Sequence, residues 1–162
     1  MLYKDSIIQM VKDGASRSSI DYRIILAIIA QESNFNPWTT RYEPSWNYIY
    51  EDVHNIVHLL GITLSTEIQC QKMSWGLGQI MGSTARSLGM VDHLTKLVDP
   101  SINILYIYKT LQGFNPHDTK TTPELFSCYN GGLGALLKVK DGKFPNQTYV
   151  DSAMEHYKSF GG

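Results

Sequence analysis

The chain has 162 residues, which is enough for one domain with a hydrophobic core of its own. Apolar residues make up 43% of it and charged residues 18%, a balance that excludes an intrinsically disordered protein. The formal net charge is −1 and no run of lysine or arginine occurs, so we expect no nucleic-acid partner. We expect a single domain over residues 1–162, and a monomer.

The first ten residues have neither the apolar segment nor the cleavage site of a signal peptide. No stretch is long and apolar enough to span a bilayer, so we expect no membrane insertion. Cys70 and Cys128 lie far apart and form no CxxC or Cys/His motif, which favours two free thiols. A single disulfide between them stays open if the protein works outside the reducing cytosol. We expect no metal and no cofactor.

Helical signals dominate the first half of the chain. The expected elements are a short helix over residues 6–12, a helix from Asp21 to about Ser33, a loop over residues 34–44, a helix over residues 46–60 and a short helix over residues 66–73. The helix that Asp21 can cap is apolar nearly all round, which is typical of a buried helix. Two prolines, at positions 37 and 44, disfavour helix in the loop that follows.

The second half is also predicted to be helical. We expect a helix opened by Gly76-Leu77-Gly78 and running to Leu88, one from Pro100 past Leu111, one from Pro123 to Tyr129, a continuation over residues 133–139 and a last helix over residues 147–160. Proline after Asp99 favours a helix start, because proline suits the first helical position. Strand alternation occurs only briefly, near Thr63-Leu64. The predicted fold class is all-α, with at most a minimal β element.

Two short motifs suggest sites that their surroundings do not support. His54 and His58 have the spacing of the zinc-protease motif HExxH, but Asn55 occupies the position of its glutamate. A structural zinc site that uses Glu51 is conceivable, whereas two exposed histidines are the favoured interpretation. The glycines from Gly76 to Gly82 have GxGxxxG spacing and follow no buried strand, so they do not indicate a dinucleotide site.

One carboxylate is unusual because it ends an apolar helix. Glu32 shares a helix face with Ile25, Ile28 and Ile29, which precede it by seven, four and three positions. Loss of hydration on such a face raises the pKa of a carboxyl group, and the negative end of the helix dipole adds to the rise. A glutamate that is protonated near neutral pH suits a general acid. Taken alone, the stretch is equally compatible with a Glu32 that turns into solvent.

Three motifs along the chain, taken together, decide between these two interpretations of Glu32. Glu32-Ser33-Asn34-Phe35-Asn36-Pro37, Trp75-Gly76-Leu77-Gly78-Gln79-Ile80-Met81 and Tyr129-Asn130-Gly131-Gly132 resemble, in this order, the motifs of lytic transglycosylases of the goose-type lysozyme-like superfamily, the SLT domain. Asn103-Ile104 also resembles the Asn-Ile helix of that family. The resemblance covers residues 19–138. It implies a lysozyme-like helical domain with a substrate groove.

The resemblance implies a peptidoglycan lytic transglycosylase that cleaves the β-1,4 bond between N-acetylmuramic acid and N-acetylglucosamine. Glu32 would act first as acid and then as base, and the muramoyl C6 hydroxyl would close on C1 to give a 1,6-anhydro end. The implied substrate-binding residues are Ser33, Trp75, Gly76, Gln79, Tyr129 and Asn130. Tyr129 would orient Glu32 through its hydroxyl. Trp75, Phe35 and Tyr42 are candidates for stacking on sugar faces, although core packing is the favoured role of each.

The sequence departs from the family pattern at three positions in or next to these motifs. Gly78 stands where the family usually has methionine, so the groove floor is expected to lose a side chain. Cys128 replaces the usual alanine, and Gly82 stands where proline is common. None of these differences removes the acid.

Residues 38–44 and 67–89 look most like the versions found in bacteriophages and prophages. With no signal peptide, this implies a phage-encoded endolysin that is made in the host cytoplasm and acts on the periplasmic cell wall, with phage lysis or virion proteins as candidate partners. A hydrolytic muramidase is the alternative enzyme, with Glu43, Glu51 or Asp52 as a second carboxylate. A non-catalytic peptidoglycan-binding virion module is the alternative outside enzymes.

Overall fold

A computed structural model describes residues 2–16 and 18–162 of the chain. The α-helices are α1 Leu2–Ala15, α2 Tyr22–Ser33, α3 Val53–Leu60, α4 Leu64–Gln71, α5 Gly82–Ser87, α6 Pro100–Phe114, α7 Thr122–Gly131 and α8 Gln147–Ser159. Two 3-10 helices are η1 Leu94–Val98 and η2 Leu133–Lys138, and the strands are β1 Thr40–Tyr42, β2 Met73–Trp75 and β3 Ile80–Met81. A helical fold with a minimal β element is therefore confirmed.

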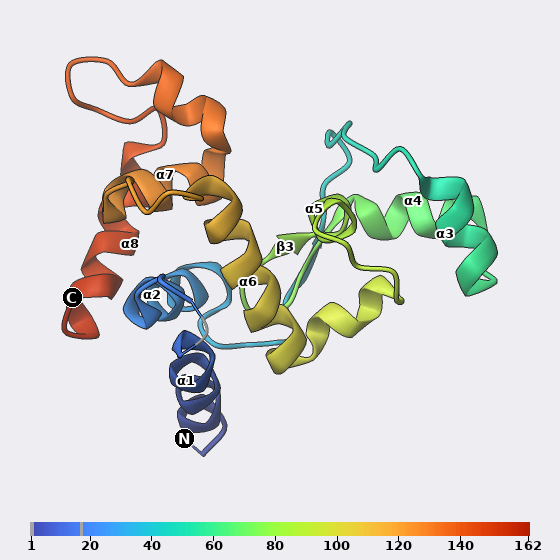
Figure 1. Ribbon diagram of the computed structural model, residues 1–162, viewed down its shortest axis with the longest axis horizontal. Coiled ribbons are helices and arrows are strands. Elements are labelled where there is room, and N and C mark those ends of the chain that lie inside the picture. Colours follow the sequence, from blue (N-terminus) through green and yellow to red (C-terminus); the bar gives the residue numbers. More distant parts are fainter. Residues whose placement is uncertain (1, 17) are drawn as a thin grey trace.

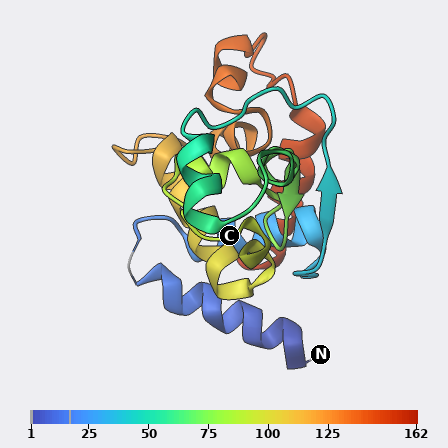
Figure 2. The same ribbon diagram turned by 90° about the vertical axis from the view of Figure 1, so that its right-hand side faces the viewer.

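Helix α6 runs through the middle of the molecule, with other elements on both sides of it (Figure 1). On one side α2, α7 and α8 pack together, and α1 lies against α2 and α6. The small sheet lies on the other side with α3, α4 and α5. Figure 2 shows α1 crossing the base of the molecule and the segment around η2 projecting at the top. No helix in the described ranges is long and apolar enough to cross a membrane.

Helix α2 is the buried helix that the sequence predicts. The Asp21 side chain accepts a 2.9 Å hydrogen bond from the backbone N–H of Arg23, which satisfies one of the free donors at the helix start. The six residues from Ile24 to Ile29 are all buried. The helix ends at Asn34, whose left-handed φ of 48° turns the chain away immediately after Glu32 and Ser33.

The prediction that a helix begins at Gly76 is wrong. Strands β1, β2 and β3 form an antiparallel sheet in this order, and the chain reverses between β2 and β3 over residues 76–79. Gly76 and Gln79 have φ values of 67° and 49°, which a right-handed helix excludes. The buried Asn103 amide holds this turn: it donates to Trp75 O at 2.8 Å and accepts from Gly78 N at 2.8 Å. Helix α5 begins only at Gly82.

Two further predictions need correction near the sheet. The helix expected from Trp46 begins at Val53, because residues before it bond to distant partners. The Trp46 indole N–H donates to Ser83 Oγ at 2.8 Å, and the Tyr50 N–H donates to Gln71 Oε1 at 2.8 Å. The strand expected near Thr63-Leu64 is the start of α4, where the Thr63 hydroxyl accepts from the Thr66 N–H at 3.1 Å.

A buried ion pair ties α4 to α5 beside the sheet. Arg86 donates to the two carboxylate oxygens of Glu67 at 2.7 and 2.9 Å, and both side chains are fully buried. The remaining guanidinium nitrogen donates to the carbonyls of Met90 and Asp92 at 2.6 and 2.7 Å. Gln71 donates a further 2.9 Å bond to Glu67. Every charge in this cluster is therefore matched by a partner, as buried ions require.

Candidate active site

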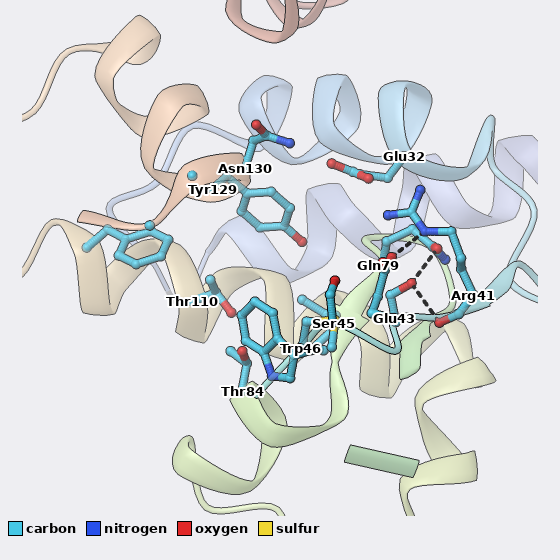
Figure 3. Close-up of a pocket in the computed structure, with 16 residues that line it drawn as sticks. Glu32, Arg41, Glu43, Ser45, Trp46, Gln79, Thr84, Thr110, Tyr129 and Asn130 are labelled. Atoms are coloured by element: carbon cyan, nitrogen blue, oxygen red, sulfur yellow. Dashed lines mark hydrogen bonds and ion pairs between the residues drawn. The ribbon is translucent and has the colours of Figure 1, made fainter. Parts of the chain in front are cut away.

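A pocket of about 480 Å³ lies where α2, the sheet, α6 and α7 meet, which is within the size range of small-ligand sites. Its lining residues are Glu32, Arg41, Glu43, Ser45, Trp46, Ser74, Gln79, Ile80, Met81, Thr84, Thr110, Phe114, Tyr129, Asn130, Gly131 and Gly132. In Figure 3 Glu32 enters from one wall, and Trp46 and Thr84 lie at the opposite side. The three motif regions of the sequence thus meet around one cavity.

Glu32 reaches this pocket from the last turn of α2 and is half-buried. Burial raises the pKa of Glu32 above its usual range, and this effect outweighs two opposing ones. A hydrogen bond from Tyr149 and the positive charge of Arg41 both lower that pKa. A raised pKa is the direction expected from the apolar helix face of Glu32, which consists of the buried residues Ile25, Ile28 and Ile29. Glu32 therefore has the environment of a general acid.

Tyr149 is the residue that holds Glu32, and sequence reasoning missed it. Its hydroxyl donates a 2.6 Å hydrogen bond to Glu32 Oε1 from helix α8. Burial raises the pKa of Tyr149 well above its usual range, and the neighbouring Glu32 carboxylate adds to the rise. The phenol therefore stays protonated and keeps its hydrogen for this bond. No local pattern marks Tyr149, because its role arises from the packing of α8 on α2.

Tyr129 lines the pocket but does not orient Glu32 in the way the resemblance implies. Its hydroxyl donates to Gly78 O at 2.7 Å, and it thereby fastens the β2–β3 turn to α7. Burial, and then the Glu32 charge, raise the pKa of Tyr129 well above its usual range. Tyr129 and Tyr149 thus both lie near Glu32, but the hydrogen bond to the carboxylate comes from Tyr149.

Gln79 and Asn130 also line the pocket, with their amides engaged within the protein. Gln79 Nε2 donates to the carbonyls of Thr39 and Gly76 at 2.9 Å each, and its Oε1 accepts from Ser74 at 2.9 Å. Asn130 Oδ1 accepts from the Asn146 amide at 2.9 Å. Gln79 therefore shapes the wall of the pocket through its backbone contacts.

Five other candidates from the sequence do not line the pocket: Ser33, Phe35, Tyr42, Trp75 and Gly76. Ser33 donates to Ile29 O at 3.1 Å, within its own helix. Trp75 is buried and its indole N–H donates to Cys70 O at 3.0 Å, while buried Phe35 packs edge-on against Phe160. Gly76 lies in the turn, where a Cβ would collide with Leu97 O. Tyr42 is exposed on β1.

Gly78 does not leave a vacant floor in the pocket, contrary to what the comparison with methionine predicts. A Cβ at this position would lie 2.5 Å from Ile107 Cγ1 and 2.6 Å from Tyr129 Oη. The space that a side chain would need is therefore already filled by Ile107 and Tyr129. The glycine lets α6 and α7 approach the turn closely.

Two aromatic residues outside the motifs also line the pocket, Trp46 from the segment after β1 and Phe114 from α6. Trp46 presents an indole ring whose N–H is bound to Ser83, and Phe114 adds a second aromatic side chain from α6. Flat apolar rings with polar neighbours suit contact with sugar faces. The position of Trp46 in the pocket could not be predicted, because the apolar spacing of residues 46–60 indicates a helix from Trp46, whereas the helix begins at Val53.

The candidate second carboxylates differ in position. Glu43 lines the pocket and forms an ion pair with Arg41, while Glu51 and Asp52 are exposed and lie outside the pocket. His54 and His58 are also exposed, and the described ranges hold no group of three His, Cys, Asp or Glu residues arranged to bind a metal. The structure leaves Cys70 and Cys128 as free thiols, in agreement with the favoured interpretation.

Residues 9–150, which are most of the chain, match the transglycosylase SLT domain family. The chain is also similar to the membrane-bound lytic murein transglycosylase C of Edwardsiella ictaluri (strain 93-146), at 24% identity over 139 residues. That match covers 82% of this chain and 33% of the relative, so the chain spans about a third of the relative's length. No solved structure gives a significant match. Since the family match spans most of the chain, the chain belongs to the transglycosylase SLT domain family.

Proposed function

We propose that the protein is a peptidoglycan lytic transglycosylase in which Glu32 is the only catalytic carboxylate. The observation that carries the proposal is the environment of Glu32. It is desolvated enough for burial to raise its pKa, it receives the Tyr149 hydroxyl at 2.6 Å, and it opens into a pocket of about 480 Å³. Family membership and the relative that is named as a murein transglycosylase support peptidoglycan as the substrate.

The proposed reaction uses one carboxyl group twice. Protonated Glu32 gives its proton to the oxygen of the bond between N-acetylmuramic acid and N-acetylglucosamine, and the C1–O bond breaks. The substrate's own N-acetyl group assists at C1. The Glu32 carboxylate then takes the proton of the muramoyl C6 hydroxyl, whose oxygen bonds to C1. The product carries a 1,6-anhydro end, and Glu32 regains its proton without consumption of water.

The pocket supports a glycan strand as ligand through its mixture of ring and amide groups. Trp46 and Phe114 offer apolar faces, and Asn130 and Thr110 offer polar groups at the same cavity. Tyr149 serves the reaction twice: it fixes the position of Glu32 and stabilises the carboxylate that proton transfer creates.

We also propose a phage or prophage origin, with action on the periplasmic cell wall as a monomeric endolysin. The resemblance of residues 38–44 and 67–89 to phage versions of the domain supports this proposal. Genes for a holin or for tail proteins beside the coding sequence would support it. A setting among housekeeping genes of a bacterial cell wall would contradict it.

Hydrolysis by a muramidase is the second candidate, and one observation favours it. Glu43 lines the same pocket as Glu32, where a second carboxylate could activate a water molecule. Its ion pair with Arg41 argues against this role, because a carboxylate oxygen that would have to bind the water already accepts a hydrogen bond from the guanidinium.

Digestion of purified sacculi tests whether the protein is an enzyme at all. The wild-type protein should release soluble muropeptides, and Glu32→Gln should reduce the release by several orders of magnitude. A non-catalytic wall-binding module would bind sacculi without release. Equal activity of the wild type and Glu32→Gln would refute the assignment of Glu32.

A further inference from the structure

Three charged side chains line the pocket within the part of the chain that the structure describes: Glu32, Arg41 and Glu43. Arg41 is the last but one residue of β1, and its Nε donates to Glu43 Oε1 two residues later. In Figure 3 the guanidinium of Arg41 lies between Glu32 and Glu43. Arg41 is therefore placed where it can approach either carboxylate.

A guanidinium that approached Glu32 would oppose the proposed reaction. A positive charge favours the ionised form of a carboxyl group, whereas a general acid must carry its proton before the reaction. Arg41 already lowers the pKa of Glu32, although burial outweighs this effect. The Arg41 side chain is 70% exposed, so packing does not fix its position. Its partner Glu43 is only 28% exposed and is therefore the better-held member of the pair.

We propose that Glu43 is a positioning residue, which holds Arg41 away from Glu32 as a counter-ion and does not act as a second catalytic carboxylate. This inference rests on the proposed function of Glu32. In this inference Glu43 affects the acid Glu32 indirectly: its carboxylate stays paired with Arg41, the single cation of the described pocket lining. Glu32 can then retain its proton nearer to neutral pH.

The other groups around Glu32 do not compete for this role. Among the residues that the structure describes, the titratable groups that face Glu32 are Tyr149 from α8, Tyr129 from α7, and Arg41 and Glu43 from β1 and the residues after it. From α6 only the neutral Thr110 and Phe114 line the pocket. On α1, Lys4 lies over the ring of Phe35. Arg41 is thus the cation to which the pH response of Glu32 is assigned.

A double-mutant cycle in the pH profile of sacculus digestion tests the inference. Glu43→Gln should move the high-pH limb of the profile to lower pH, because it frees Arg41 to pair with Glu32. The ratio of the rates at pH 8 and pH 5 should fall roughly two- to fivefold, the range typical of an exposed ion pair. In an Arg41→Gln background, Glu43→Gln should not move the limb. Glu43→Asp keeps a carboxylate and should restore the wild-type limb.

The same cycle names the results that would overturn the inference. Loss of activity at every pH after Glu43→Gln, in both backgrounds, would make Glu43 a catalytic carboxylate. An equal limb shift in both backgrounds would mean that Glu43 acts on Glu32 directly, and no shift in either would remove its role. Thermal unfolding of each variant verifies that it is folded. Activity that survives Glu32→Gln would instead refute the proposed function, so the two failures are distinguishable.

Discussion

The Tyr149 hydroxyl donates a 2.6 Å hydrogen bond to Oε1 of Glu32 from a position 117 residues later in the chain. This contact joins the end of α2 that carries Glu32 to α8, and the two helices pack along each other. A hydrogen bond to a carboxylate is stronger than one between neutral groups, and it also sets where the carboxyl group points. Tyr149 therefore influences both the position and the proton affinity of Glu32.

Tyr149→Phe should lower the maximum rate of sacculus digestion by roughly tenfold or more, the range expected for loss of a hydrogen bond to a charged group. The same change should move the high-pH limb of the activity profile to higher pH. The hydrogen bond from Tyr149 lowers the pKa of Glu32, so its loss lets that pKa rise further. A rate measurement across pH 4–9 checks both effects.

Tyr157→Phe is the matched control for this experiment. Tyr157 also lies on α8, and its hydroxyl donates to Asp21 at 2.9 Å, away from the pocket. Its removal should leave the pH of the limb unchanged. A limb shift of equal size in both variants would show that α8 acts through general stability and would contradict the role of Tyr149.

Glu32→Gln should make the protein more stable at pH 7, even though it removes activity. Burial raises the pKa of folded Glu32 above its ordinary value of 4.5, so the folded state holds this proton more tightly than the unfolded chain. The stability from this proton is complete below the ordinary pKa and is lost as the pH rises through the folded pKa. Glutamine has no such loss, so the melting temperature at pH 7 should be higher in Glu32→Gln than in the wild type.

Melting curves at pH 4 and pH 7 check this prediction. The gain should shrink towards zero at pH 4, where Glu32 is protonated in the wild type. Glu155→Gln, at an exposed position on α8, should change the melting temperature at neither pH. A Glu32→Gln variant that is less stable than the wild type at pH 7 would contradict the claim that Glu32 is a desolvated acid.

Much of this fold could be predicted from sequence where the signals are local. The Asp21 cap, the apolar run after it and the Pro100 start of α6 are each set by residues close in the chain. The β2–β3 turn could not be predicted in this way, because it depends on the amide of Asn103 in α6. From the local sequence alone, its glycines indicate a helix start.

The site was predictable in the same uneven way. Glu32 could be found because its helix face and its position at the helix end are both visible in sequence. Tyr149 and Trp46 could not, since their roles come from contacts with residues 117 and 37 positions away. Tyr129 lines the pocket, but its hydroxyl donates to Gly78 O and not to Glu32.

Arg86→Met should lower the free energy of unfolding by about 3–5 kcal/mol, because it leaves the Glu67 carboxylate buried without its ion-pair partner. The carbonyls of Met90 and Asp92 would lose their donor as well. Urea unfolding measures the change. Lys96→Met removes one member of the exposed pair with Asp92 and should have no measurable effect. A similar decrease in the free energy of unfolding for both variants would contradict the claim that burial makes the Arg86–Glu67 pair more important than an exposed pair.

Gly78→Ala should destabilise the protein, since its Cβ would lie 2.5 Å from Ile107 Cγ1. A loss of about 1–3 kcal/mol is expected, as for overpacking of a core. In an Ile107→Ala background the same change should cost less, because the nearest atoms are gone. Urea unfolding of the four proteins gives the coupling between the two positions. Strict additivity would show that Ile107 does not fill the space at Gly78.

Digestion of sacculi in water enriched in oxygen-18, followed by mass spectrometry of the muropeptides, tests the central claim most directly. An intramolecular attack by the C6 hydroxyl predicts muramoyl ends that are one water lighter than hydrolytic ends and carry no oxygen-18. Both properties should disappear together with the products in Glu32→Gln. Reducing ends that contain oxygen-18 would show that a water molecule attacks C1, and would contradict a single-carboxylate transglycosylase.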